Sequence, residues 1–163
     1  MRFSPETFPY IEAHEPAASN AIGTTCDAVN VAYADGVWIV VHEDYAVDAN
    51  QLTLVVNYGT TSALAIAGAT TISSTFGGWK NITAQTSDAI TALTAAASHS
   101  LDGETAGNNC LWWFYIPAAI IPNGYNWIQA DFAATGDAGN IASVVYILDR
   151  ARYKSQAPPT AVA

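Results

Sequence analysis

The sequence has few charged residues and very few basic ones. Charged residues make up 12% of the 163-residue chain, against roughly 25% in a typical domain. Five lysines and arginines stand against fourteen aspartates and glutamates, which gives a net charge of -9. Because so acidic a surface repels a phosphate backbone, nucleic acid is not an expected partner.

The chain also lacks an export signal and a membrane-spanning run. The opening MRFSPETFPYIEAHEP mixes acids, prolines and aromatic residues, whereas a secretory signal has a positive start followed by an apolar stretch. The apolar stretch LWWFYIPAAII is broken by Pro117 and falls short of the ~20 residues that span a bilayer. We therefore expect no export and no membrane partner.

Cysteine is scarce as well. Cys26 and Cys110 are too few and too far apart in sequence for a zinc site. A disulfide between them is geometrically possible, but in a chain without an export signal two free, buried thiols are favoured.

No catalytic or cofactor-binding signature is present. The histidines, His14, His42 and His99, lie in three different contexts, and the sequence has no nucleophile elbow, zinc-protease motif, phosphate loop or dinucleotide fingerprint. The densest titratable cluster, His42-Glu43-Asp44, is interpreted as the polar end of a strand rather than a metal or acid–base site. These absences predict a protein that is not an enzyme and holds no cofactor or metal.

What the chain does have is apolar sequence in short, strand-like segments. Hydrophobic residues make up 51% of it, enough for one folded domain. About eight segments of alternating or β-branched residues are separated by Gly, Asn and Asp turns, with no long amphipathic helix and no internal repeat. The pattern predicts an all-β fold with a single-domain jelly roll or β-sandwich; an immunoglobulin-like sandwich and a small closed barrel are alternatives.

The predicted boundaries are an N-terminal arm over residues 1–25, the jelly-roll domain over 26–154 and a C-terminal arm over 155–163. Residues 87–98 are ambiguous between helix and strand, and strand is favoured because threonines alternate with apolar residues. Residues 59–78 carry only scattered apolar anchors and remain unassigned. The expected core consists of apolar members of the strand-like runs: Val37, Ile39, Leu52, Leu54, Phe114, Ile128, Val144 and Tyr146.

Aromatic residues are the most conspicuous candidates for binding. Trp112 and Trp113 are adjacent, so they point to opposite faces of their predicted strand, and one of them is expected to contact a partner. A stacking platform for sugars is the competing interpretation, and it would draw on Trp79, Trp112, Trp113, Tyr115, Tyr125 and Trp127. The low charge content favours a surface that is partly covered in an assembly.

Six sequence blocks together span most of the chain from Val29 to the end. They are V-x-V-x-Y-A-D-G-V-W-I-V-V (Val29–Val41), L-T-L-V-V (Leu52–Val56), W-K-N (Trp79–Asn81), F-Y-I-P-A (Phe114–Ala118) with Gly124-Tyr125, I-L-D-R-A-R-Y (Ile147–Tyr153) and P-P-T-A-V (Pro158–Val162). In their order and spacing these blocks resemble the head decoration or cement proteins of tailed bacteriophages, a family with a jelly-roll fold.

The resemblance implies a non-enzymatic virion protein, made in the host cytoplasm, that binds the outer surface of the capsid. Its partner would be the major capsid protein, and it would act as a homodimer or other small homo-oligomer that reinforces contacts between capsomers. No binding site carries over from the family residue by residue. A carbohydrate- or receptor-binding module and a small enzyme with an unrecognised site remain alternatives.

The candidate interface residues combine exposed aromatics with the basic C-terminal end. That end would meet an acidic strip on the shell or on a neighbouring copy, unless it is only a solvated strand end. The candidates are Trp79, Lys80, Trp112, Trp113, Arg150, Arg152, Tyr153, Lys154, Pro158 and Pro159.

Overall fold

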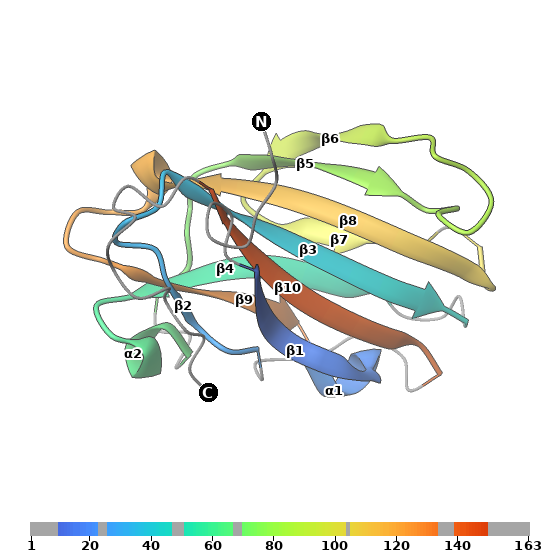
Figure 1. Cartoon of the computed structure of the whole chain (residues 1–163), viewed down its shortest axis with the longest axis horizontal. Helices are drawn as coiled ribbons and strands as arrows, with labels where there is room; N and C mark the ends of the chain where they lie inside the picture. Colours follow the sequence, from blue (N-terminus) through green and yellow to red (C-terminus); the bar gives the residue numbers. More distant parts are fainter. Residues whose placement is uncertain are drawn as a thin grey trace.

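Two antiparallel β-sheets, packed face to face, make up the computed structural model (Figure 1). The structure describes residues 10–22, 26–46, 51–66, 70–103, 105–133 and 139–149. Within these ranges the prediction of an all-β sandwich is confirmed.

The larger sheet has six strands in the spatial order β1-β10-β3-β8-β5-β6. The smaller sheet has four strands in the order β2-β9-β4-β7 and lies behind the larger one in Figure 1. The strands of the larger sheet are β1 (Tyr10–Ala18), β3 (Gly36–Tyr45), β5 (Phe76–Asn81), β6 (Thr91–Ala96), β8 (Asn108–Pro117) and β10 (Ile141–Asp149). Those of the smaller sheet are β2 (Val29–Asn30), β4 (Leu52–Gly59), β7 (His99–Leu101) and β9 (Trp127–Ala133).

The connections alternate between the sheets. Among the described strands, each consecutive pair lies in different sheets except the β5–β6 hairpin. Three short helices join this framework: α1 (Ser19–Ile22), α2 (Ser62–Ile66) and the 3-10 turn η1 (Ala118–Ile120). Helix α2 packs on β4 and β9 of the smaller sheet.

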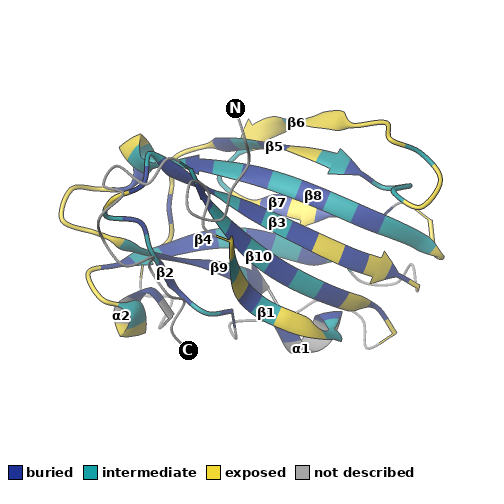
Figure 2. Cartoon of the chain, in the orientation of Figure 1, coloured by how far each residue is buried: buried dark blue, intermediate teal, exposed yellow. Residues whose placement is uncertain are grey.

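The core forms between the sheets because side chains alternate along each strand. Figure 2 shows this alternation as bands along β3, β8 and β10. On β3, for example, Val37, Ile39 and Val41 are fully buried, and the residues between them are half-buried. All eight residues predicted for the core are buried, so that prediction is confirmed. Burial of each large aliphatic side chain contributes roughly 1.5–3 kcal/mol.

Two glycines are required by the local geometry. A β-carbon on Gly78 of β5 would lie 2.6 Å from a ring carbon of Phe114, so the close approach of β5 to β8 depends on the missing side chain. Gly124 has a φ of +90°, a conformation that favours glycine. The turn expected at Asn123-Gly124 is therefore present.

The N-terminal region differs from the prediction. Residues 10–22, expected to belong to an extended arm, form the edge strand β1 and helix α1, because β1 pairs with β10 at the far end of the chain. Pro16 is tolerated there because an edge strand needs no ladder hydrogen bond on its outer side. The rest of the predicted N-terminal arm at 1–9, and the C-terminal arm at 155–163, lie outside the described residues.

Two ambiguous segments are also resolved. Residues 91–96 form a strand and not a helix, as favoured from the sequence. The unassigned stretch 59–78 holds the end of β4, helix α2 and the start of β5. The alternating residues Val29, Val31 and Tyr33 suggest a strand of five residues, but β2 is shorter and pairs with β9 at two residues only.

Both cysteines are buried and unbonded, as predicted. Cys26 lies in the connection between α1 and β2, and Cys110 lies on β8.

Candidate functional site

The outward surface of the six-stranded sheet carries a continuous set of apolar side chains, here called the outer face. Along β3, β8, β5 and β10 these side chains alternate with the buried core residues. In Figure 1 none of the described helices lies over them. The outer face consists of Trp38, Val40, Trp79, Leu111, Trp113, Tyr115, Val145 and Ile147.

Strand register brings seven of these eight residues into two rows across the sheet. One row runs Val145, Val40, Trp113 and Trp79 over four neighbouring strands. A second row runs Ile147, Trp38 and Tyr115 over three strands. Directly opposed residues on neighbouring strands contact one another, so the rows form one apolar surface.

Three of the aromatic rings contact one another within this surface. The ring centroids of Trp38 and Tyr115 are 4.8 Å apart, and those of Trp38 and Trp79 are 5.7 Å apart. The Trp38 and Trp79 side chains therefore meet above β8, which separates their strands. Trp79 keeps 41% of its surface exposed. Contiguous exposed apolar side chains of this kind mark interaction sites.

Polar groups occur only at the borders of the outer face. At one end the Tyr115 hydroxyl donates a hydrogen bond to Asp149 Oδ2 at 3.0 Å. At the other end His42 and Asp44 are exposed on β3, and on the β1 side the exposed Glu12 is paired with Val145. An apolar centre with a polar rim is the usual composition of a protein–protein contact.

The predicted interface residues do not all lie on one surface of the structure. Trp113 and Trp79 are direct cross-strand neighbours on the outer face, and Lys80 follows Trp79, half-buried. Trp112 is fully buried in the core, so its inclusion among the candidates is corrected: its side chain is not accessible to a partner. The remaining candidates lie outside the described residues: Arg150, Arg152, Tyr153, Lys154, Pro158 and Pro159.

The aromatic residues considered as a sugar platform do not gather on one surface. Trp127 lies on β9 of the smaller sheet, and Tyr125 packs edge-on against Tyr58. Trp38, which occupies the middle of the outer face, was missed from the sequence. Its outward direction follows from the alternation that places Val37 and Ile39 in the core.

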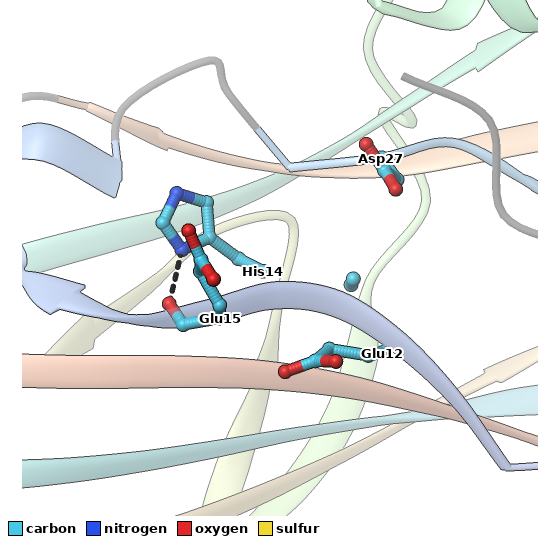
Figure 3. Close-up of a pocket in the computed structure, with 5 residues that line it drawn as sticks. Glu12, His14, Glu15 and Asp27 are labelled. Carbon is cyan, nitrogen blue, oxygen red and sulfur yellow. Dashed lines mark hydrogen bonds between the residues drawn. The ribbon is translucent and has the colours of Figure 1, made fainter.

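A small polar cavity of about 330 Å³ lies between β1 and the chain that leads to β2 (Figure 3). His14 Nδ1 donates a hydrogen bond to the carbonyl oxygen of Glu15 at 2.6 Å. Glu12 lies on the other side of β1 from His14 and Asp27. Burial raises the pKa of Asp27, and the nearby His14 opposes that rise. The carboxylates do not converge on one point, so the cavity does not assemble a catalytic group.

The three histidines stay apart in the structure. His14 borders the cavity, His42 is exposed on β3, and His99 is buried with Nε2 2.9 Å from the Phe76 carbonyl oxygen. Within the described ranges, no group of three His, Cys, Asp or Glu residues is arranged to hold a metal ion.

Glu43 is the one member of the His42-Glu43-Asp44 cluster that enters the core. It is fully buried, and burial raises its pKa to about 7, although the Asn140 and Ser19 side chains oppose part of the rise. Neither carboxyl oxygen has a hydrogen-bond partner of good geometry among the described residues. The sequence contained a signal for this burial, since Glu43 continues the alternation of Val37, Ile39 and Val41.

Comparisons with known proteins found no match: no family model, no curated protein and no solved structure is significantly similar to the chain. The part of the chain that the structure describes contains no helix long and apolar enough to cross a membrane.

Proposed function

We propose that this protein is a non-enzymatic structural component of a phage virion that binds the outer surface of the capsid and reinforces contacts between capsomers. Its partner is the major capsid protein. The observation that carries the proposal is the outer face, an apolar surface of eight residues with a polar rim on a four-strand-wide part of the sheet. The ordered sequence blocks that resemble decoration proteins support the same function.

The topology supports the proposal as well. Without the β5–β6 hairpin, the sheets have the orders β1-β10-β3-β8 and β2-β9-β4-β7. The eight remaining strands cross alternately between the two sheets. The first of them, β1, lies beside the last, β10, and the second, β2, lies beside β9. We infer that the sandwich is a jelly roll, an architecture common in viral shells.

The size of the outer face fits a repeated, weak contact. Four strands about 4.8 Å apart, over a length of about five residues at ~3.4 Å rise, give a face of about 300 Å². A standard protein interface buries about 800 Å² per partner. One such contact is weak, but copies linked by the symmetry of a shell or by their own association bind with higher avidity.

Ring geometry favours a protein partner over a carbohydrate. Planar stacking of sugars needs accessible ring faces, whereas Trp38 is tilted by 38° from Trp79 and by 41° from Tyr115. Apart from Trp113, the remaining side chains of the outer face (Val40, Leu111, Val145 and Ile147) are aliphatic and offer no hydrogen bonds to sugar hydroxyls. An irregular apolar surface of this kind is complementary to the apolar side chains of another protein.

The test is whether the protein copurifies with intact phage particles and is visible as density on their outer surface. Trp79→Ala is the informative variant, because Trp79 is the most exposed residue of the outer face and its removal leaves the core intact. Loss of a central interface tryptophan costs roughly 2 kcal/mol or more, which is about a thirtyfold loss of affinity per contact. Occupancy on particles should therefore fall.

The matched control is Tyr33→Ala. Tyr33 is 48% exposed and lies in the connection between β2 and β3, outside the four strands that carry the outer face. Occupancy should be unchanged in this variant. Absence of the wild-type protein from particles would overturn the proposal, and retention on a glycan array that is lost in Trp79→Ala would establish the carbohydrate-binding alternative.

A further inference from the structure

The two edges of the six-stranded sheet are built differently. The β1 edge carries Pro16, exposed Glu12 and Glu15, and two irregularities in its register with β10. Proline, charge and bulges are the devices by which proteins prevent an edge strand from pairing with another chain. The β1 edge is therefore protected.

The β6 edge has almost none of these devices. Its sequence, TALTAA, contains no charged residue and no proline, and its ladder with β5 has a single irregularity, opposite Gly77. Four of its six residues are exposed and two are half-buried. In Figure 1 β6 forms the upper border of the sheet, and Figure 2 shows it as largely exposed.

Exposed apolar side chains flank this open edge. Ile90, the residue before β6, has 63% of its surface exposed, and Trp79 on the neighbouring β5 has 41%. Trp79 is paired directly with Ala92 of β6. The backbone edge thus continues into the outer face, and a chain that added to the edge would also cover apolar surface.

We propose that β6 pairs antiparallel with β6 of a second copy of this chain. The two exposed β6 strands would then form hydrogen bonds with each other and join the two six-stranded sheets into one continuous sheet. A pair of identical antiparallel strands is compatible with two-fold symmetry, the commonest symmetry of homodimers. Because β6 is uncharged, self-pairing brings no like charges together, even though the whole chain carries a net charge of -9.

Such a dimer has a defined shape. The two-fold axis stands perpendicular to the joined sheet, so the outer faces of both copies lie side by side on the same surface. Self-pairing goes beyond the proposed function and does not depend on it. Where that function holds, the dimer presents two outer faces at once, and the second contact forms at a high effective concentration.

The first experiment measures the oligomeric state of the full-length protein by sedimentation, from about 1 to 100 µM, concentrations that bracket a micromolar affinity. The variant Thr94→Lys/Ala95→Lys adds two charges to β6 at positions without a one-to-one partner on β5, so it disturbs the strand pairing within the chain least. We expect the wild type to dimerise and the variant to dimerise about tenfold or more weakly.

A matched control separates edge blocking from a general change in charge. Ala119→Lys/Asn123→Lys places the same two charges at exposed positions at and after η1. Since extra lysines reduce repulsion between acidic copies, this variant should dimerise at least as well as the wild type. Equal weakening of both double variants would overturn the proposal, as would a wild type that stays monomeric.

A second measurement identifies the contacting surface without adding charge to β6. A spin label on Ala95→Cys should give an inter-copy distance below about 20 Å, and a label on Ala119→Cys, separated from the edge by β5 and β8, more than about 25 Å. Site-selective labelling is feasible because Cys26 and Cys110 are buried. If the protein dimerises but the labels on Ala95→Cys are not close to each other, the dimer uses another surface. If the Ala95→Cys label becomes immobile only on phage particles, β6 pairs with the shell. Either result refutes self-pairing.

Discussion

Glu43 makes the stability of this protein depend on pH in an unusual direction. Most carboxylates stabilise a fold when they ionise, because their pKa is lowered in the native state. Burial instead raises the pKa of Glu43 from 4.5 to about 7. Below pH 4.5 the group is protonated in both states and contributes nothing. As the pH rises from 4.5 to 7, the unfolded chain releases the proton and the folded chain retains it, so folding becomes less favourable.

The magnitude follows from the difference between the two pKa values. A difference of about 2.5 corresponds to about 3 kcal/mol of lost stability above pH 7. Replacing Glu43 with glutamine keeps the shape and removes the ionisation. We therefore expect Glu43→Gln to be about as stable as the wild type near pH 4.5 and more stable by up to about 3 kcal/mol at pH 8.

The assay is urea denaturation of both proteins at several pH values between 4.5 and 8. Comparison at each pH cancels the other titrating groups, including the three histidines. Asp44→Asn is the control, since Asp44 is the exposed neighbour on the same strand, and its removal should change stability by no more than about 0.5 kcal/mol. If the difference between Glu43→Gln and the wild type is the same at pH 5 and pH 8, the carboxyl is not held protonated in the core and the reasoning fails.

Three further predictions concern packing and reactivity. Trp112→Ala should lower the free energy of unfolding by about 3–5 kcal/mol, and Trp113→Ala on the outer face by much less; equal losses in urea denaturation contradict the assignment of the two side chains. Gly78→Ala should lower the free energy of unfolding by roughly 1–3 kcal/mol, because the added methyl group overpacks the contact with Phe114. Gly77→Ala is the control, since a β-carbon on Gly77 meets open space. Equal melting temperatures for Gly78→Ala and Gly77→Ala would refute the close approach of β5 to β8. Burial raises the pKa of both cysteine thiols, so both should resist a thiol reagent at pH 8 until the protein is denatured, and rapid labelling of the native protein would show that they are accessible.

The core and most strands were predictable because alternation is a local property. Val37 and Ile39 show which positions of β3 point into the core. The same alternation of side chains assigns Trp38 to the outer face and Glu43 to the core. The burial of Glu43 was missed because the polar triplet His42-Glu43-Asp44 was interpreted as the end of a strand. Trp38 was missed although it lies between two residues predicted for the core, Val37 and Ile39. Likewise, Trp112 lies two residues from Phe114 on β8, so the alternation that buries Phe114 also buries Trp112.

The elements that sequence reasoning missed depend on distant parts of the chain. β1 carries two register irregularities and a proline, so no local pattern identifies it, and it is a strand because β10 pairs with it. The outer face is similarly a product of register. Trp79 and Trp38 are far apart in sequence, and only the order β3-β8-β5 brings their rings together.

The position of β10 has a consequence for how the protein is made. β10 is inserted between β1 and β3, although it follows all the other described strands in the sequence. During translation, therefore, β1 has no ladder partner and β3 keeps an unpaired edge until residues up to 149 have left the ribosome. Since unpaired strand edges promote aggregation of partly folded chains, the nascent protein passes through a vulnerable stage that ends only when β10 closes the sheet.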